Sequence, residues 1–191
     1  ANRILVQRPI AAEFSERLAH RMGALAMGRG VDDGVSVGPL INKAAVQKVQ
    51  QLVTDAIDKG ATVRIGANPD DRPGNFYPAT VLTGVPDDAE LCSTEIFGPV
   101  AAVSEFDTED EAIRIANDTP YGLVSYAYTQ DLARGFRVSE ALEAGMVGLN
   151  RGVISNPAAP FGGVKESGLG REGGFTGIDE FLETKYVGVS F

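Results

Sequence analysis

The 191-residue sequence has no tryptophan, one cysteine and one histidine, and its 17 lysines and arginines are outnumbered by 26 acidic residues. A single cysteine excludes an intrachain disulfide framework and a cysteine-rich zinc site. The net charge of −9 argues against nucleic-acid binding, which requires clustered lysine and arginine. No apolar run approaches the roughly 18 residues that a membrane-spanning helix needs. We therefore predict a cytoplasmic protein that binds neither nucleic acid nor membrane.

The lone cysteine and the lone histidine do not suggest a catalytic pair. A nucleophilic thiol requires a base and an orienting group. His20 falls in a different expected helix, one rich in glutamate and arginine. We predict that Cys92 is a small, structural, buried side chain and that His20 lies at or near the surface. The sequence shows no histidine, cysteine or carboxylate pattern typical of a metal site.

Strand-like and helix-like segments alternate along the chain, which favours an α/β fold with a parallel sheet and right-handed crossovers. Expected strands are 4–6, 61–65, 76–85, 100–106, 123–128, 146–149 and 183–191. Expected helices are 10–27, a helix from an Asn42 cap to about 59, a helix from about 108 to 118, 131–143 and a short one at 177–182. The last strand has no crossover partner. It either pairs with another subunit at a sheet edge or extends the sheet of this chain.

A loop rich in glycine and proline occupies residues 156–174. Its segment 168–173 fits the G-x-G-x-x-G pattern of dinucleotide-binding proteins. Pro157 and Pro160 are incompatible with the strand that such a motif requires, and no βαβ unit is completed after it, so we reject this interpretation. The loop follows the expected strand 146–149, and ligands of α/β proteins bind beyond the carboxyl ends of strands. We therefore expect the loop to border a site.

The segment 95–99 reads Glu-Ile-Phe-Gly-Pro and precedes an expected strand. A carboxylate accepts hydrogen bonds from ribose hydroxyls, and an aromatic ring packs on a flat heterocycle. The alternative is a solvated Glu95 and a core Phe97 in a turn. From these residues alone, we favour the solvated Glu95 and the core Phe97.

Three segments taken together resemble successive signatures of the aldehyde dehydrogenase superfamily. They are 95–100 (EIFGPV), 116–123 (ANDTPYGL) and 160–172 (PFGGVKESGLGRE). Their order and spacing also fit, and the resemblance runs from Ala1 to Phe191. Residues 153–156 (VISN) and 177–187 are most similar to the succinate-semialdehyde dehydrogenase branch.

The resemblance implies oxidation of an aldehyde by NAD or NADP, through a cysteine thiohemiacetal and a thioester that a glutamate-activated water hydrolyses. Carried over by motif, Glu95 holds the nicotinamide ribose and Phe97 packs near the nicotinamide ring. Leu123 lines the nicotinamide pocket, and Lys48 approaches the cofactor. The choice between NAD and NADP stays open.

On the substrate side, the resemblance implies that Phe161 lines the aldehyde tunnel. Ser155 hydrogen-bonds the distal carboxylate of a semialdehyde. Arg151 departs from the family pattern, and its cation either attracts an anionic substrate or faces solvent.

In the family, the nucleophilic cysteine precedes a segment resembling Ala1–Gln7 by a few residues. This sequence also lacks the general-base glutamate, the oxyanion-hole asparagine, an arginine of the semialdehyde site and the dinucleotide-binding domain. We therefore expect residues 1–180 to be a catalytic domain truncated at its N-terminus, without a catalytic residue and inactive alone. Residues 181–191 are expected to be the oligomerisation strand of a homo-oligomer, a dimer or tetramer. The alternatives are a dehydrogenase for another aldehyde and a non-catalytic oligomerisation module.

Overall fold

The computed structural model describes residues 1–70 and 72–191. The chain folds into two compact units, Ala1–Ala112 and Ile113–Phe191. We call them the first and the second unit and describe each by itself.

The first unit contains a four-stranded sheet in the order β1-β4-β3-β2. Its strands are β1 (Ile4–Gln7), β4 (Val100–Phe106), β3 (Thr80–Thr83) and β2 (Thr62–Ile65). β1, β4 and β3 are parallel, as predicted, but β2 runs antiparallel to β3, so the sheet is mixed. The reversal has a physical cause, because the chain between β2 and β3 forms no helix among the described residues. A parallel connection needs such a crossover.

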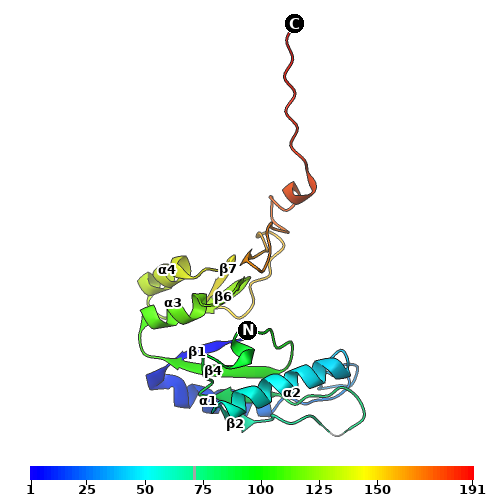
Figure 1. Ribbon diagram of the computed structural model, residues 1–191, viewed down its shortest axis with the longest axis vertical. Helices are drawn as coiled ribbons and strands as arrows, with labels where there is room; N and C mark the ends of the chain where they lie inside the picture. Colours follow the sequence, from blue (N-terminus) through cyan, green and yellow to red (C-terminus); the bar gives the residue numbers. More distant parts are fainter. Residues whose placement is uncertain (71) are drawn as a thin grey trace. The chain divides into compact units, whose positions relative to one another are not determined.

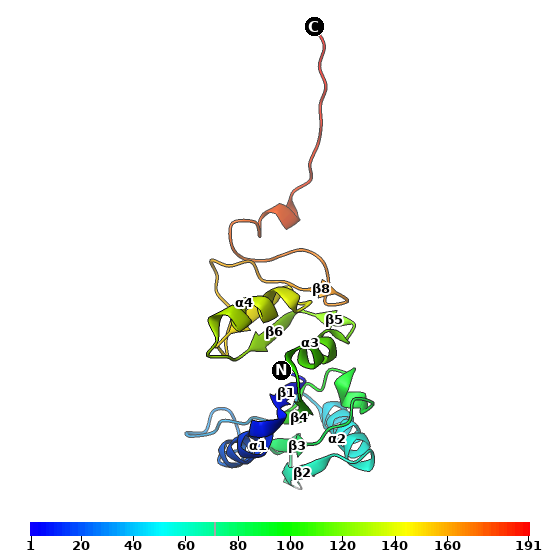
Figure 2. The same cartoon turned by 90° about the vertical axis from the view of Figure 1, so that its left-hand side faces the viewer.

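Two helices cover opposite faces of this sheet (Figure 2). They are α1 (Arg8–Gly23) and α2 (Lys43–Asp58). Val100 and Ala102 of β4 belong to the core that includes Val49 of α2, whereas Val103 packs with Ala11 of α1. Because both faces are covered, the strand is a continuous apolar run rather than an alternating one.

A local sequence signal correctly predicted the start of α2, whereas the ends of α1 differ from the prediction. Asn42 caps α2 as predicted, and its Oδ1 accepts a hydrogen bond of 2.9 Å from the Ala45 backbone N–H. By contrast, α1 begins at Arg8, before the predicted start, because Pro9 is tolerated in a first helical turn. It also ends at Gly23 rather than at residue 27. Beyond it, Met27 pairs with Val37 in an isolated β-bridge, which competes with continued helix.

The second unit contains a parallel pair of strands, β6 (Val124–Ala127) and β7 (Met146–Leu149), joined through helix α4 (Leu132–Ala141). A short antiparallel pair joins β5 (Tyr121–Gly122) to β8 (Val164–Lys165) inside the glycine-rich segment. Helix α3 (Glu109–Asn117) starts at the end of the first unit and continues into the second. These elements place the glycine-rich segment beside the strands that precede it.

The C-terminal segment differs from the prediction. The expected helix at 177–182 is a 3₁₀ turn, η2 (Asp179–Phe181). Residues 183–191 are extended but pair with no described strand (Figure 1), so they do not extend the sheet of this chain. A strand requires a neighbour for its backbone hydrogen bonds, and residues 1–70 and 72–182 offer this segment none. Its pairing with another subunit stays a prediction.

Candidate cofactor and substrate site

The turn at 95–98, just before β4, exposes two side chains around a buried one. Ile96 is in the core of the first unit with 3% exposure, whereas Glu95 is exposed and Phe97 is 75% exposed. Phe97 also has a φ of 49°, a left-handed conformation that costs a bulky residue free energy. The alternative of a core Phe97 is therefore wrong, and the ring is presented at the surface. Its contact with a cofactor stays a prediction.

Asn2 holds this turn in place. Its Nδ2 donates to the carbonyl oxygens of Leu91, at 2.6 Å, and Thr94, at 3.2 Å. Its Oδ1 accepts from the backbone N–H of Ile96 at 2.9 Å. One amide side chain thus ties together the backbone on both sides of Glu95. Sequence reasoning missed Asn2, because its partners are 89 to 94 residues away and no local spacing marks them.

The same turn packs closely on α2. A Cβ atom on Gly98 would lie 2.7 Å from Cγ2 of Val49, so only glycine fits at this position. Lys48 precedes Val49 on α2 and is exposed. The structure therefore brings the helix of Lys48 against the turn of Glu95 and Phe97. The roles of Glu95, Phe97 and Lys48 towards a cofactor stay predictions.

Cys92 belongs to the packing of the first unit. Its side chain packs against the core, and its Sγ lies 3.5 Å from the carbonyl oxygen of Pro86. Burial raises the pKa of the Cys92 thiol, which keeps it protonated at neutral pH. Since a thiolate is the reactive form, this environment supports the structural role predicted for Cys92, although its side chain is half-buried rather than buried. His20 is exposed on α1, as predicted.

In the second unit, Phe161 lines a hollow of about 210 Å³ in the glycine-rich segment. The hollow is lined by Gly145, Met146, Ile154, Asn156, Ala159, Pro160 and Phe161. The backbone of Phe161 is fixed by two hydrogen bonds to Glu172, of 2.7 and 2.8 Å. The mostly apolar wall suits the carbon chain of a small organic substrate.

The remaining predicted site residues lie in the same unit, outside that lining. Leu123 is 39% exposed, and its Cα would be 3.2 Å from a Cβ on Gly163. Ser155 is exposed between two residues that line the hollow. Arg151 is exposed in the turn after β7, with no ion pair to the described residues. Four predicted site residues thus belong to the second unit, namely Leu123, Ser155, Phe161 and Arg151, whereas Glu95, Phe97 and Lys48 belong to the first.

The turn that carries Arg151 is well defined. Asn150 has a φ of 53°, and its side chain exchanges two hydrogen bonds with the backbone of Thr129, of 2.9 and 2.8 Å. Asparagine tolerates this left-handed conformation better than most residues. Arg151 is therefore presented by a turn that is anchored to Thr129, the second residue after the neighbouring strand β6.

The described residues lack two other kinds of feature. Over residues 1–70 and 72–191, no group of three or more potential metal ligands comes together. In the same residues, no helix has the length and apolar character needed to cross a bilayer.

Comparison with known proteins gives a consistent result. The profile of the "Aldehyde dehydrogenase family" matches residues 1–187. A succinate-semialdehyde dehydrogenase of Paenarthrobacter nicotinovorans is 54% identical over 190 residues, which are 100% of this chain and 42% of that protein. A glutarate-semialdehyde dehydrogenase of Pseudomonas putida is 49% identical over 190 residues, 100% of this chain and 39% of that protein. The chain thus spans about two fifths of the length of these relatives.

A solved structure is also similar to this chain, in both fold and sequence. The crystal structure of succinate-semialdehyde dehydrogenase from Burkholderia pseudomallei superposes with a TM-score of 0.93 at 48% sequence identity. The alignment covers 95% of this chain and 38% of that one.

Proposed function

Because the chain belongs to the aldehyde dehydrogenase family, we propose that the protein containing it oxidises an aldehyde to the carboxylic acid with NAD or NADP. We further propose succinate semialdehyde as the aldehyde. The observation that carries the activity is the turn of Glu95 and Phe97, which exposes a carboxylate and an aromatic ring on a strained backbone. The identity to a succinate-semialdehyde dehydrogenase over the whole chain supports the substrate.

On the cofactor side, the Glu95 carboxylate accepts hydrogen bonds from the nicotinamide ribose, and the Phe97 ring packs near the nicotinamide. Lys48 contributes a positive charge near the cofactor, and Leu123 contributes an apolar wall. When bound, NAD or NADP supplies the oxidising group that takes up a hydride. The role of these four residues is to bind and orient it, and none of them transfers a proton.

On the substrate side, Phe161 forms a wall along the path of the aldehyde. The Ser155 hydroxyl donates to the distal carboxylate, and Arg151 attracts that carboxylate through space. Both side chains are exposed, and the arginine has no ion pair to the described residues, so each is available to an anion. In a chain of net charge −9, a local cation matters for drawing in an anionic substrate.

The nucleophilic cysteine and the general base are supplied by parts of the protein outside these 191 residues. The one cysteine present has a raised thiol pKa and packs against the core. We therefore expect no aldehyde turnover by the 191-residue polypeptide alone. The free cysteine also suits a reducing compartment such as the cytoplasm.

The test replaces the corresponding region of the Paenarthrobacter relative by this chain and follows NAD(P)H formation. The substrates are succinate semialdehyde, glutarate semialdehyde and uncharged butanal. We expect kcat/KM to be at least about tenfold higher for succinate semialdehyde than for butanal, as expected for one charge-assisted contact. No turnover of any aldehyde would contradict the proposed activity. Turnover favouring butanal would remove the roles of Ser155 and Arg151.

Two alternatives each have a specific observation in their favour. Glutarate-semialdehyde dehydrogenases are also close relatives, at 49% identity, so the five-carbon semialdehyde is the second candidate substrate. The tail 183–191 is extended, unpaired and exposes Tyr186, Val187 and Phe191, which favours edge-strand pairing in a homo-oligomer. Deleting residues 183–191 should lower the oligomeric state of the fusion in light scattering. An unchanged state would contradict the pairing role.

A further inference from the structure

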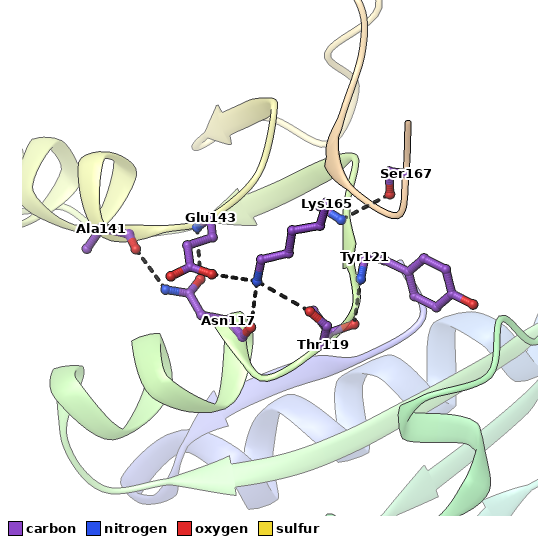
Figure 3. Close-up of polar contacts among 8 residues, drawn as sticks. Asn117, Thr119, Tyr121, Ala141, Glu143, Lys165 and Ser167 are labelled. Atoms are coloured by element: carbon purple, nitrogen blue, oxygen red, sulfur yellow. Dashed lines mark hydrogen bonds and ion pairs between the residues drawn. The ribbon is translucent and has the colours of Figure 1, made fainter. Parts of the chain in front are cut away.

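Lys165 is a charged side chain of the second unit that is held by several contacts. It lies in β8 with a φ of 55°, a left-handed conformation that is uncommon for lysine. Its Nζ donates to the backbone carbonyl oxygens of Asn117, at 2.8 Å, and Thr119, at 3.3 Å (Figure 3). It also forms an ion pair with Glu143. An ammonium group has three N–H bonds, and three oxygens surround this one.

The carbonyl of Asn117 is a suitable acceptor for a cation. Asn117 is the last residue of α3, where backbone carbonyls lack helical partners and the helix dipole is negative. The Asn117 side chain then connects to the end of α4. Its Nδ2 donates to the Ala141 carbonyl at 2.8 Å, and its Oδ1 accepts from the Glu143 N–H at 2.9 Å. Lys165 and Asn117 thus join the ends of two helices to β8.

Residues on both sides of Lys165 in the sequence also fix the position of the glycine-rich segment. The Ser167 Oγ accepts from the Gly122 N–H at 3.0 Å (Figure 3). On the other side, a Cβ on Gly145 would lie 2.0 Å from the carbonyl oxygen of Gly162, which shows how closely the two backbones approach. Phe161 directly precedes Gly162, and Gly145 and Phe161 line the same hollow.

We propose that Lys165 is a positioning residue, whose ammonium holds the glycine-rich segment against α3 and α4 and so fixes the Phe161 wall of the hollow. Its importance for an aldehyde rests on the proposed function. The effect of Lys165 on the glycine-rich segment is independent of the proposed function, because it depends only on contacts within the folded chain. From its left-handed backbone, the lysine ammonium contacts all three oxygens.

The first test measures amide hydrogen exchange in the 191-residue chain. Lys165→Met removes the ammonium and keeps most of the side chain volume. We expect the Phe161 and Glu172 amides to exchange about tenfold faster, the effect of losing a hydrogen bond to a charged group. Amides of β7 should change by less than about twofold. Lys43→Met, an exposed lysine of α2, is the matched control and should leave both sets unchanged.

Lys165→Gly separates the two features of this residue. Glycine adopts the left-handed backbone freely but has no ammonium. Faster exchange at Phe161 and Glu172 in this variant would support the proposal. Unchanged or slower exchange of these two amides would overturn the proposal, because the left-handed backbone alone would then be sufficient to hold the segment. Equally faster exchange throughout β6 and β7 would also overturn it, by showing a role in the whole unit.

The second test uses the fusion enzyme. Lys165→Met should raise KM for succinate semialdehyde about tenfold, with kcat and KM for NAD(P) changed by less than about threefold. Asn117→Ala should act in the same direction, and Lys165→Arg, which keeps the charge, should recover part of the loss. A fall in kcat alone would overturn the positioning role. If the unmodified fusion is inactive, the proposed function fails, and hydrogen exchange still decides the role of Lys165.

Discussion

At the scale of single residues, the most consequential side chains satisfy backbone groups far away in the sequence. Asn2 uses both ends of its amide on the turn of residues 91–96, and Tyr77 is fully buried with its Oη 3.1 Å from Gln50 Oε1 and 3.2 Å from the Ala67 carbonyl. Neither residue binds or reacts in the proposed function. Asn2 holds the turn of Glu95 and Phe97, whereas Tyr77 belongs to the core of the first unit.

Replacing Asn2 should destabilise the first unit. Asn2→Ala leaves three backbone groups without their partner and should lower the free energy of unfolding by about 1–3 kcal/mol. Asn2→Asp should be worse at neutral pH, because its carboxylate would face two carbonyl oxygens. The difference between the two variants should shrink below about pH 4, where the aspartate is protonated. Urea unfolding at both pH values measures this, and equal stability of Asn2→Ala and the unmodified chain would contradict it.

Tyr77 should make the stability depend on alkaline pH. Burial raises the pKa of Tyr77 from its ordinary 10 to about 12. The unfolded chain therefore loses this proton first, so stability is complete below pH 10 and falls as the pH rises towards 12. The loss attributable to Tyr77 should be about 2–3 kcal/mol. In Tyr77→Phe, which cannot ionise, urea unfolding should show a shallower decline over this range. An identical decline would show that the hydroxyl ionises equally in both states.

At the scale of elements, the close approach of a turn to helix α2 determines what that helix supports. The turn of Glu95 and Phe97 lies on α2 because Gly98 has no side chain to collide with Val49. The helix is therefore both a part of the core and a platform for the proposed cofactor residues. Substitutions at this contact should affect stability and the turn together.

Gly98→Ala should lower the free energy of unfolding by about 1–3 kcal/mol, as expected for overpacking against a buried valine. Adding Val49→Ala should recover part of that loss, because it removes the colliding methyl groups. The double mutant should therefore lose less free energy of unfolding than the two single mutants lose together. Gly30→Ala is the control, since a Cβ there meets nothing within 4 Å. Additive effects in urea unfolding would contradict the steric explanation.

The elements also show how far a single sequence determines the fold. Strands β4 and β7 were predicted with their observed bounds, because each is an apolar run between polar residues or turns. The cap at Asn42 was found because its signal is local. The direction of β2, the ends of α1 and the state of residues 183–191 depend on partners elsewhere in the chain or outside it. For the site, motifs indicated Glu95 and Phe161, whereas Asn2 was missed because its contacts span some 90 residues.

At the scale of the whole molecule, the two units differ in how much apolar surface they bury. Among the described residues, Met146 is the one buried apolar side chain of the second unit, whereas the first has two clusters of buried apolar side chains. Leu132 and Phe136 of α4 are 68% and 63% exposed. Burying such a side chain contributes about 1.5–3 kcal/mol, a contribution largely missing here. The second unit should therefore be the less stable one in this chain alone.

Native-state hydrogen exchange tests this expectation. In the 191-residue chain, amides of β6 and β7 should exchange at least about tenfold faster than those of β3 and β4. Within the fusion enzyme, protection of β6 and β7 should rise if the additional chain covers α4. Equal protection of both units in the chain alone would contradict the link between buried area and stability.

The structure of the turn at 95–97 also limits which mutations this segment can accept. Asn2 fixes its backbone on one side, Val49 limits it on the other, and Ile96 points into the core between two outward side chains. Inserting or deleting one residue would exchange inward and outward positions, directing a carboxylate into the core and an isoleucine to the surface. Substitutions at positions 95 and 97 leave that pattern intact. The fold of the segment should therefore tolerate changes of residue identity at its two outward positions better than changes in its length, even though such substitutions would remove the proposed cofactor contacts.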